Sequence, residues 1–438
     1  MTYFETLRTA LLAKTARIGV IGMGYVGLPL LARAGRVGYH VIGFDISAER
    51  NAMINDGVSY IGDVPSADLA ALRADRRIEA TADFAHLAAC DVVVICMPTP
   101  LNAARDPDMS YIEAATAEVA GRLRPGQLVI LESTTYPGTT VEVLQPAFDA
   151  RGLQVGEEYF LAFSPERIDP GSANFQVHNI PKVVGGVTPQ CTEVTSAFYT
   201  QIVSAVTTVS SPDAAEMTKL FENIFRNVNI ALVNELTMIC DRMGLNVWEV
   251  IDAAATKPFG FMRFTPGPGL GGHCIPLDPF YLAWKARQYD ISARFIELAG
   301  EINMMMPRFV RERVIQALNT QQRSVNGSQI VLLGVAYKKD IDDYRESPVF
   351  KVMELLQEDG ATVRCCDPHL TTFYDHHNRE FQTVPLTDEL LGRANCVVII
   401  TDHSAFDYER IVARSAVVVD TRNATRNVSA NREKIRLL

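Results

Sequence analysis

The chain has 438 residues, a formal net charge of −10 and eight cysteines. This length exceeds one compact core, so two or three domains are expected. The acidic charge excludes broad, non-specific nucleic-acid binding, although a local basic pocket can still bind a small anion. No stretch approaches the roughly 20 continuous apolar residues that span a bilayer, and the first residues lack the apolar core of an export signal. We therefore expect a cytoplasmic protein that binds neither membrane nor nucleic acid.

The first part of the chain alternates apolar strand-like runs with helix-like stretches. Buried parallel strands are predicted at 16–24, 40–45, 91–98 and 127–134, with helices at 25–38 and 111–126. This alternation is typical of a doubly wound α/β domain, which we place at residues 1–205.

A dinucleotide site is predicted at the first strand. Gly22, Gly24 and Gly27 form G-x-G-x-x-G between a strand and a helix, where a tight turn lets a pyrophosphate approach the backbone. Asp45 ends the next strand and would accept hydrogen bonds from ribose hydroxyls, which favours NAD over NADP. A flavin is the competing ligand.

Other side chains are expected to contact this cofactor. They lie in the glycine turn, in the turn after Asp45, and at the carboxyl ends of two later strands, where open α/β sheets bind ligands. They are Met23, Tyr25, Val26, Arg50, Thr99, Ser133 and Thr134. For Arg50 a solvated surface position is nearly as reasonable, and for the hydroxyl residues the alternative is a turn or capping role.

The rest of the chain changes character twice. Residues 212–243 predict one helix of about 30 residues, which is long for a globular domain and typical of a domain bridge or a self-pairing helix. A mostly helical central domain is expected at 206–310. From residue 329 strands and helices alternate again, which predicts a second Rossmann-like domain at 311–438. The expected fold is thus two Rossmann-like doubly wound α/β domains joined by a long helix and a small helical domain.

A few polar residues stand out as candidates for chemistry. Cys274 lies with Asp278 in GGHCIPLD, a loop sequence in which a buried packing role is hard to justify, whereas cysteines in apolar runs are expected to be small buried hydrophobes. Lys219 and Asn223 are four apart on the long predicted helix and so share one face. Glu166 lies in FSPER. Taken singly, Lys219 and Asn223 would more often lie on a solvated helix face. Asp278 would usually be a turn residue, and Glu166 would usually be an exposed loop charge.

Together these segments resemble the UDP-glucose/GDP-mannose dehydrogenase family over nearly the full length of the chain. The matching segments are GMGYVGLP, FSPER, EMTKLFEN, GPGLGGHCIPLDP and GVAYKKDIDDYRESP. The resemblance implies a four-electron oxidation of a sugar CH2OH to a carboxylate with two NAD molecules used in turn. It also implies a homodimer, or a higher homo-oligomer, built on the long helix.

The resemblance also assigns roles. Cys274 would form a thiohemiacetal and then a thioester, which water hydrolyses. Lys219 and Asn223 would stabilise the oxyanion, Asp278 would position or deprotonate water, and Glu166 would act as a base in hydrolysis.

Binding residues follow from the same resemblance. Arg345 would contact NAD, and the UDP-sugar would meet cations and backbone groups spread over several segments. The expected substrate-binding residues are Arg167, Lys219, Asn223, Arg263, Phe264, Pro266, Gly267, Gly269, Tyr337, Lys338 and Arg422. The family's arginine that crosses between subunits has no clean match, since Lys257 and Arg263 both lie off the expected spacing.

The choice of sugar rests on departures from the UDP-glucose pattern. Leu277 stands where a lysine is usual, and Pro170 stands where a second glutamate is usual. The loop resembles the bacterial UDP-N-acetylglucosamine 6-dehydrogenase branch, which feeds O-antigen and capsule synthesis. The expected reaction is therefore oxidation of UDP-N-acetylglucosamine to UDP-N-acetylglucosaminuronate, with UDP-N-acetylgalactosamine or UDP-glucose as alternatives.

Other classes of function make different predictions. A two-electron NAD dehydrogenase without covalent catalysis would retain activity in Cys274→Ala, and a non-catalytic nucleotide sensor would make no NADH. A zinc site at Cys365, Cys366, Asp367 and His369 lacks a partner set elsewhere, so this cluster is interpreted as a strand end with turn chemistry and no metal is expected.

Overall fold

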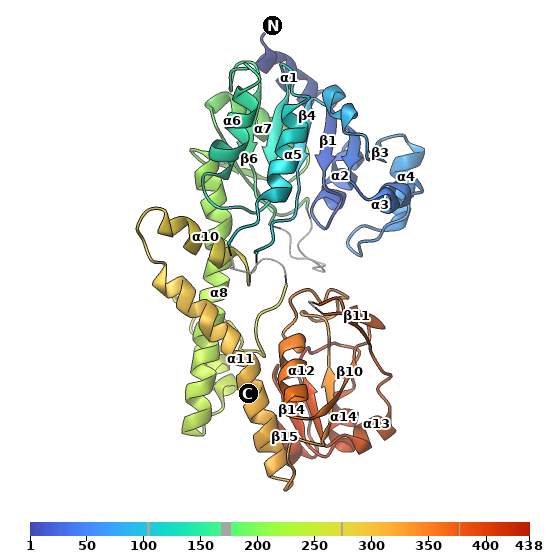
Figure 1. Cartoon of the computed structure of the whole chain (residues 1–438), viewed down its shortest axis with the longest axis vertical. Helices are drawn as coiled ribbons and strands as arrows, with labels where there is room; N and C mark the ends of the chain where they lie inside the picture. The colour runs from blue at the N-terminus through green and yellow to red at the C-terminus, as the bar shows by residue number, and fades with distance from the viewer. Residues whose placement is uncertain (103–105, 168–176, 273–274, 376) are drawn as a thin grey trace. The chain divides into compact units, whose positions relative to one another are not determined.

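The computed structural model describes residues 1–102, 106–167, 177–272, 275–375 and 377–438. It divides into two compact units (Figure 1). Unit 1 comprises Met1–Glu222 and Phe280–Ile291, and unit 2 comprises Asn223–Pro279 and Ser292–Leu438. Among the described residues, no helix is both long and apolar enough to cross a membrane.

Unit 1 is built on an eight-stranded sheet in the order β3-β2-β1-β4-β5-β6-β7-β8. Its strands are β1 (Arg17–Ile21), β2 (His40–Phe44), β3 (Ile78–Thr81), β4 (Val92–Ile95), β5 (Leu128–Leu131), β6 (Phe160–Phe163), β7 (Lys182–Gly186) and β8 (Val206–Thr208). All neighbours are parallel except β6 and β7, which run antiparallel. The order of the first six strands reverses between β1 and β4, the position at which such sheets bind dinucleotides.

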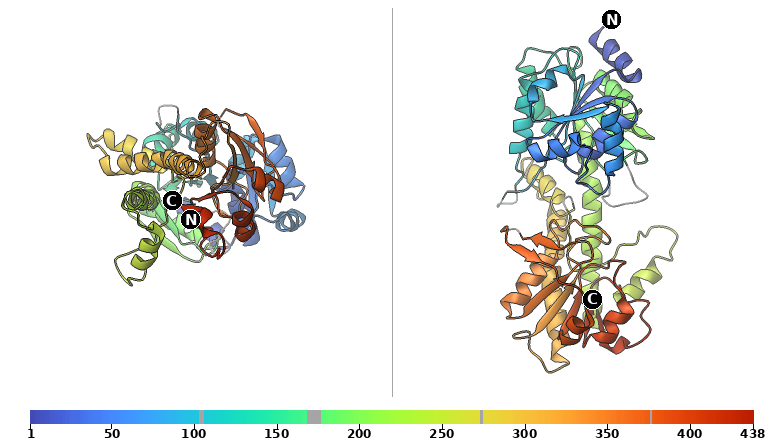
Figure 2. Two further views of the ribbon diagram at one scale, coloured as in Figure 1. Left: turned by 90° about the horizontal axis from the view of Figure 1, so that it is seen from below. Right: turned by 90° about the vertical axis from the view of Figure 1, so that its right-hand side faces the viewer.

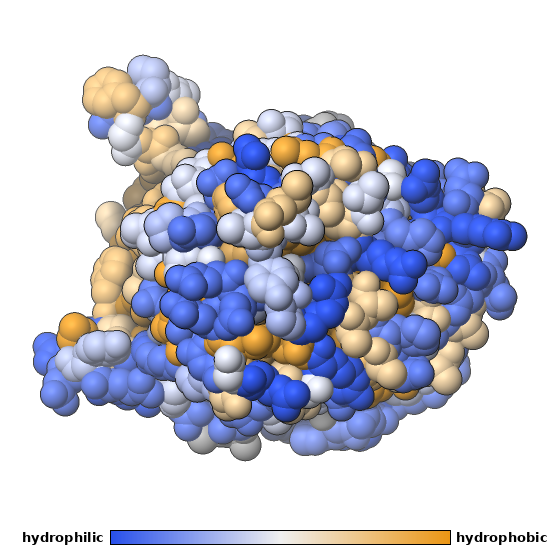
Figure 3. All heavy atoms as spheres, turned by 90° about the horizontal axis from the view of Figure 1, so that it is seen from above, coloured by the Kyte–Doolittle hydropathy of each residue, from blue (hydrophilic) through white to orange (hydrophobic). Residues whose placement is uncertain are grey.

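Helices cover both faces of this sheet (Figure 2). They are α1 (Tyr3–Leu12), α2 (Gly27–Arg36), α3 (Ala48–Asn55), α4 (Ser66–Ala74), η1 (Phe84–Ala89), α5 (Ser110–Ala120), η2 (Thr140–Leu144), α6 (Gln145–Asp149) and α7 (Pro189–Tyr199). Helices α1, α2, α4 and α7 contribute to one apolar core, and α5 and α6 contribute to the other. Because the strands are buried on both faces, they are apolar throughout rather than alternating. On the face of unit 1 shown in Figure 3, polar residues dominate and apolar residues form small separate groups.

Unit 2 contains a five-stranded parallel sheet in the order β10-β9-β13-β14-β15. Its strands are β9 (Gln329–Leu333), β10 (Thr362–Cys366), β13 (Cys396–Ile399), β14 (Val418–Asp420) and β15 (Ile435–Leu437), and β11 (Thr372–Tyr374) pairs separately with β12 (Glu380–Gln382). Its helices are α9 (Val247–Ala254), α11 (Arg294–Asn319), α12 (Val349–Glu358), α13 (Asp388–Arg393), α14 (Tyr408–Arg414) and η3 (Arg432–Lys434). Helices α11 and α12 pack on one face of the sheet, and α13 and α14 pack on the other.

The long helix predicted from the sequence is α8 (Pro212–Met243), and it belongs to both units because the division falls after Glu222. Helix α10 (Asp278–Arg287) is likewise divided between them. The two doubly wound sheets confirm the predicted fold class. The predicted domain boundaries stay predictions, and residue 310 lies within the continuous helix α11.

The first half of α8 is anchored in unit 1 by a buried carboxylate. Glu216 accepts hydrogen bonds from the backbone N–H groups of Gly138 and Thr140, at 2.7 and 3.0 Å, and from the Thr140 hydroxyl at 2.7 Å. Burial raises the pKa of Glu216 to about 7 despite these donors. The contact thus joins α8 to the segment that follows β5.

Glu216 makes the stability of the protein depend on pH. In the unfolded chain the carboxyl ionises near its ordinary pKa of 4.5, and in the folded chain near 7, so the folded state binds more protons between these values. Stability should therefore fall by on the order of 3 kcal/mol as pH rises through this window and change little from this group above it. When the free energy of unfolding is measured with denaturant from pH 4.5 to 8, Glu216→Gln should not show this fall. Glu235→Gln, which removes an exposed carboxylate from the same helix, should retain it.

Candidate functional site

The glycine turn in unit 1 has the shape that a pyrophosphate requires. A Cβ on Gly22, whose φ is +90°, would lie 2.4 Å from the Cys96 carbonyl oxygen, and one on Gly27 would lie 1.9 Å from the Gly22 carbonyl oxygen. A Cβ on Gly24 would meet nothing within 4 Å. Gly22 and Gly27 are therefore required by packing, whereas Gly24 leaves open space beside the backbone at the start of α2. The turn fits a dinucleotide.

Asp45 closes the end of β2 beside this turn. Its carboxylate accepts hydrogen bonds from the N–H groups of Met23 and Ser47, both at 2.9 Å, and pairs with the Arg50 guanidinium at 3.3 Å. Arg50 therefore lies beside Asp45 with half of its side chain exposed, and its contact with the adenosine side stays a prediction. The remaining acceptor capacity of the carboxylate suits ribose hydroxyls.

Tyr60 belongs to the same cluster, although nothing in the sequence marked it. Its hydroxyl donates to the Met23 carbonyl oxygen at 2.6 Å, and its ring lies 5.8 Å from the guanidinium carbon of Arg50. Burial raises the pKa of Tyr60, so its hydroxyl remains a donor. Tyr60 occurs in a polar loop, where an aromatic residue carries no motif.

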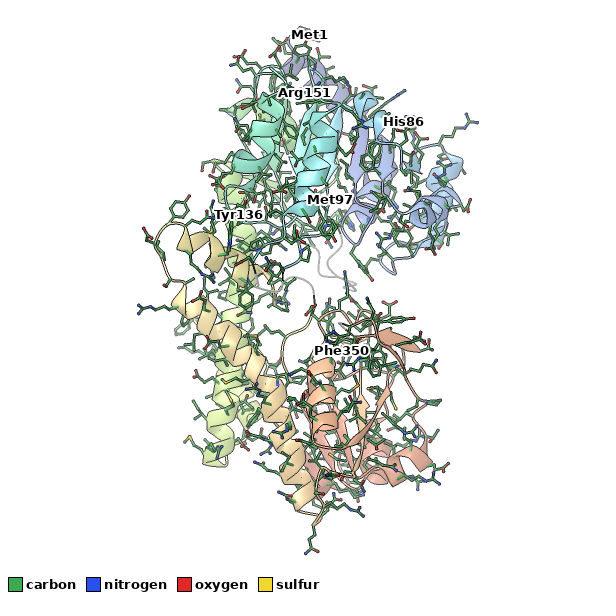
Figure 4. All side chains as sticks on the ribbon, viewed as in Figure 1. Met1, His86, Met97, Tyr136, Arg151 and Phe350 are labelled. Atoms are coloured by element: carbon green, nitrogen blue, oxygen red, sulfur yellow. The ribbon has the colours of Figure 1, made fainter. Side chains whose placement is uncertain are left out.

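The predicted hydroxyl residues lie at the carboxyl edge of the sheet. Met97 and Tyr136, which follow β4 and β5, mark this edge on the side of unit 1 away from Met1 (Figure 4). The Ser133 hydroxyl accepts from the Met97 N–H at 2.8 Å and donates to the Ile95 carbonyl oxygen at 3.3 Å, so it links β4 to β5. The Thr99 carbonyl accepts from the Tyr281 hydroxyl at 3.0 Å. Cofactor contacts by Thr99, Ser133 and the half-buried Thr134 stay predictions.

Unit 1 also carries three of the residues predicted for catalysis or substrate binding. Lys219 on α8 is only 7% exposed, and none of the described residues forms a hydrogen bond or ion pair with its ammonium. Arg167 pairs with Glu222 at 2.6 Å and donates to the Pro181 carbonyl at 2.8 Å. Glu166 pairs with the buried Lys182 at 3.0 Å. Arg167 is thus already bound to a carboxylate, whereas Lys219 is buried without one.

In unit 2, α8 holds the loop that leads to Asp278. Asn223 donates its side-chain amide to the Asp278 carboxylate, and both are buried. Asn227 donates to the Ile275 carbonyl at 3.1 Å, and Asn234 accepts from the Gly267 N–H at 3.1 Å. Asn223, Asn227 and Asn234 therefore fix both ends of the 267–278 loop. Asn223 was predicted from the sequence. Asn227 and Asn234 were not, because their spacing along the helix was their only signal.

The predicted nucleophile Cys274 lies outside the described residues, as does Pro170. The other cysteines, at 90, 96, 191, 240, 365, 366 and 396, are all buried and unpaired, which agrees with their predicted packing role.

The loop before Cys274 packs against two predicted substrate-binding segments. Gly267 lies against Arg422, whose Nη1 would be 2.5 Å from an added Cβ. Gly272 has a φ of +85° and lies against the Tyr337 ring, 2.9 Å from an added Cβ. The Arg422 guanidinium also donates to the Ile400 carbonyl at 2.9 Å. Gly267, Tyr337 and Arg422 thus converge at the carboxyl edge of the unit 2 sheet, and Lys338 follows Tyr337.

The remaining residues predicted to bind substrate or NAD differ in burial and in their partners. Gly269, with a φ of +137°, packs against Pro348, and Pro266 is buried. The Phe264 ring lies 5.8 Å from the Phe225 ring. Arg263 is exposed and pairs with Asp252 at 2.7 Å. The Arg345 guanidinium binds both oxygens of Asp343, at 2.9 and 2.7 Å, so a contact with NAD stays a prediction.

The segment CCDPH has the predicted strand-end chemistry. Cys365 and Cys366 lie in the cores on opposite faces of the sheet, so they cannot share a metal ion. The Asp367 carboxylate accepts from the Val335 N–H at 2.6 Å and from the His403 Nε2 at 3.1 Å. Atoms of Asp340, His369 and His403 come within 4.8 Å of one another, but His403 Nδ1 accepts the Asp340 N–H, which engages both ring nitrogens.

The glycine turn and Asp45 form a site of the kind that binds NAD, and unit 2 has a second parallel sheet of the nucleotide-binding type, a combination that indicates a dinucleotide-dependent enzyme. Residues 16–203 match the NAD binding domain of the UDP-glucose/GDP-mannose dehydrogenase family, residues 213–305 its central domain and residues 331–427 its UDP binding domain. The chain belongs to this family. It is an oxidoreductase of the nucleotide-sugar dehydrogenase class with NAD as its cofactor.

Relatives with several sugar specificities resemble the chain over most of its length. The UDP-N-acetyl-D-glucosamine 6-dehydrogenase of Pseudomonas aeruginosa is 34% identical, with 90% of this chain and 92% of the relative covered. The NDP-N-acetyl-D-galactosaminuronic acid dehydrogenase of Ralstonia nicotianae is 37% identical, with 92% and 95% covered. A solved structure of the UDP-D-ManNAc dehydrogenase from Pyrococcus horikoshii has a TM-score of 0.85 at 33% identity, covering 93% of this chain and 96% of that chain.

A side chain at position 24 should block the cofactor without disturbing the fold. Gly24→Val should raise the Kd for NAD by about tenfold or more, because the added atoms occupy the space that the pyrophosphate needs. The Tm should change by no more than about 2 °C, since no neighbour lies within 4 Å of the added Cβ. Gly62 is equally open, so Gly62→Val is the matched control and should bind NAD normally. Calorimetric titration with NAD measures both, and equal affinities would contradict the placement of the pyrophosphate.

Proposed function

We propose that the chain oxidises the C6 hydroxymethyl group of UDP-N-acetylglucosamine to a carboxylate, in an NAD-dependent four-electron reaction that uses Cys274 as nucleophile. One observation carries the proposal. Lys219 is buried without a partner among the described residues, one turn of α8 before the buried pair of Asn223 and Asp278. An ammonium that no carboxylate of the described residues neutralises can bind developing negative charge, which is the role proposed for Lys219.

NAD, when bound, supplies the hydride acceptor for each of the two oxidations. Between them, the Cys274 thiolate adds to the carbonyl carbon of the aldehyde, which forms a C–S bond and moves the π electrons onto oxygen as an oxyanion. Protonation gives the thiohemiacetal, and loss of a second hydride and the hydroxyl proton gives the thioester. The Lys219 ammonium stabilises the oxyanion. Asn223 uses one N–H on Asp278 and keeps the other for the same oxygen.

Hydrolysis completes the reaction. Glu166 takes a proton from water as the water oxygen attacks the thioester carbon, and the C–S bond breaks to release the acid and regenerate Cys274. Asp278 orients the water. Overall, the alcohol, two NAD⁺ and one water give the carboxylate, two NADH and three protons.

The UDP group is proposed to bind at the carboxyl edge of the unit 2 sheet. Lys338 and Arg422 supply positive charge to the diphosphate, which reconciles an anionic substrate with an acidic chain. Burial lowers the pKa of Arg422, but an arginine remains protonated at neutral pH. Backbone groups of residues 264–269 would line the sugar.

The choice of an acetamido sugar has two supports. Leu277 replaces a charged residue with an apolar one in the cysteine loop, which would suit a neutral, bulkier substituent. The relatives from Pseudomonas, Ralstonia and Pyrococcus are all named for N-acetylated sugars. Because the Pyrococcus structure resembles the chain closely, UDP-N-acetylmannosamine is the second candidate.

The yield of NADH from a limiting amount of sugar nucleotide tests the mechanism and the substrate together. UDP-N-acetylglucosamine should give two NADH per sugar, and UDP-N-acetylmannosamine, UDP-N-acetylgalactosamine and UDP-glucose should react at least about tenfold more slowly in kcat/KM. Cys274→Ser should abolish the full yield. Cys240→Ser, which replaces a buried cysteine of α8, should leave it at two.

Each other outcome has a definite meaning. Two NADH from another of these sugars keeps the mechanism and replaces the substrate. One NADH, unaffected by Cys274→Ser, would overturn covalent catalysis.

We also propose that α8 forms a homodimer. Phe221, Phe225, Leu232, Ile239 and Met243 recur at intervals of four and seven residues along α8, and all are exposed in the single chain. Such a stripe of large apolar side chains on one helix is typical of a self-pairing surface.

A charge in this stripe should separate the subunits. In light scattering, the wild-type protein should have twice the chain mass of 48.3 kDa, and Leu232→Lys should approach the mass of one chain. Ile46→Lys, at an apolar residue of unit 1 that is 85% exposed, should remain dimeric. A monomeric wild-type protein, or a dimeric Leu232→Lys variant, would count against the proposal.

A further inference from the structure

A cluster of ionisable side chains lies behind Glu166 at the carboxyl edge of the unit 1 sheet. Lys182 is the first residue of β7, and because β7 runs antiparallel to β6, its amino end lies at the carboxyl edge. The Lys182 ammonium contacts Glu132 at 2.9 Å, Glu166 at 3.0 Å and the Pro165 carbonyl oxygen at 3.2 Å. Lys182 therefore joins the ends of β5, β6 and β7.

The cluster is buried and almost fully hydrogen-bonded. The side chain of Glu132 has no exposed surface, and those of Lys182 and Glu166 are 4% and 12% exposed. Tyr199 of α7 donates its hydroxyl to Glu132, and its ring lies 5.2 Å from the Lys182 ammonium. The ammonium is thus enclosed by acceptors and one aromatic face.

A need for folding stability does not by itself explain a buried cluster of charged side chains. Apolar side chains of similar size often replace buried ion pairs without loss of stability. Desolvation lowers the pKa of Lys182, but Glu132 and Glu166 outweigh it and raise that pKa above its ordinary value. Desolvation also raises the pKa of Glu132. One permanent cation therefore lies between two carboxylates.

We propose that Lys182 is a positioning residue for Glu166, holding its carboxylate ionised and aimed for thioester hydrolysis, while Glu132 and Tyr199 fix Lys182. This inference rests on the proposed function. Lys182 binds Oε2 of Glu166, and the Arg167 N–H binds Oε1 at 2.6 Å, so both oxygens are held. The cation favours the ionised form of Glu166, and Glu132 moderates that effect.

The opposed charges predict pH shifts of opposite sign. Among the described residues, the ionisable groups around Glu166 include Lys182 of β7, Glu132 after β5, Cys96 after β4, Tyr199 of α7, and the pair of Arg167 and Glu222 of α8. Lys182→Met removes the favourable cation, so Glu166 should ionise at higher pH. Glu132→Gln removes the competing anion, so Glu166 should ionise at lower pH.

Kinetics and covalent trapping test the proposal on the full-length enzyme with NAD and UDP-N-acetylglucosamine, or whichever of the four sugar nucleotides gives two NADH. The acid limb of the kcat profile should move up by about one pH unit or more in Lys182→Met and down in Glu132→Gln. Acid-quenched Lys182→Met should accumulate an acyl adduct on Cys274 by intact-protein mass. Lys285→Met is the matched control, since Lys285 is also buried in unit 1 and binds Glu142 at 2.7 Å, and it should show neither change.

Two further measurements separate this role from loss of folding and from failure of the proposed function. Lys182→Met/Glu132→Gln keeps the net charge of the cluster, so it should fold and still accumulate the adduct. The infrared band of the Glu166 carboxyl group is identified by its loss in Glu166→Gln. Titrating this band in the other proteins reports the ionisation of Glu166 without substrate. The role of Lys182 would be overturned if the infrared titration midpoint of Glu166 did not move, or if it moved in the same direction in Lys182→Met and in Glu132→Gln. If the infrared shifts have the expected signs but no sugar nucleotide gives two NADH, only the proposed function is overturned.

Discussion

The directions in which Lys219 and Asn223 project depend on the rotational register of α8. In unit 1 this helix is fixed by Glu216, whose carboxylate binds backbone groups of residues 138–140. In unit 2 it is fixed by Asn223, Asn227 and Asn234, which bind the 267–278 loop. A shift of one residue would rotate every side chain by about 100° and break all these contacts together. Lys219 lies between the two sets, so its position on the helix is determined from both sides.

Close packing against Arg422 and Tyr337 explains the glycines at positions 267 and 272 of the cysteine loop. Gly267 and Gly272 lie closer to Arg422 and Tyr337 than any larger residue could. The Gly267 N–H also binds Asn234, and the Gly272 N–H donates to the Arg345 carbonyl oxygen at 3.1 Å. The backbone itself therefore forms much of this surface. Backbone donors beside an arginine favour an anionic or polar ligand, and they do so locally, whatever the net charge of the chain.

Sequence periodicity predicted the regular elements well because burial on both sheet faces leaves long apolar runs. The helix at 212–243 and the strands at 16–24 and 40–45 on either side of the first helix are examples. The strand β7 was not predicted, and its antiparallel direction could not have been, because a buried strand reads the same in either direction. The site was predicted from motifs, so residues without a motif were missed, namely Tyr60, Glu132, Lys182, Asn227 and Asn234. Their importance lies in contacts between segments far apart in sequence, such as Lys182 with Glu132, which no local pattern encodes.

Three buried lysines of unit 1 differ in their partners. Lys285 binds both oxygens of Glu142, and Lys182 binds Glu132 and Glu166. In each case the cost of removing an ammonium from water is offset by carboxylates that remain in place. Lys219 has no such partner among the described residues. Under the proposed mechanism, Lys219 should therefore stabilise the charged form of a bound substrate more than the neutral one, as stabilisation of a developing oxyanion requires.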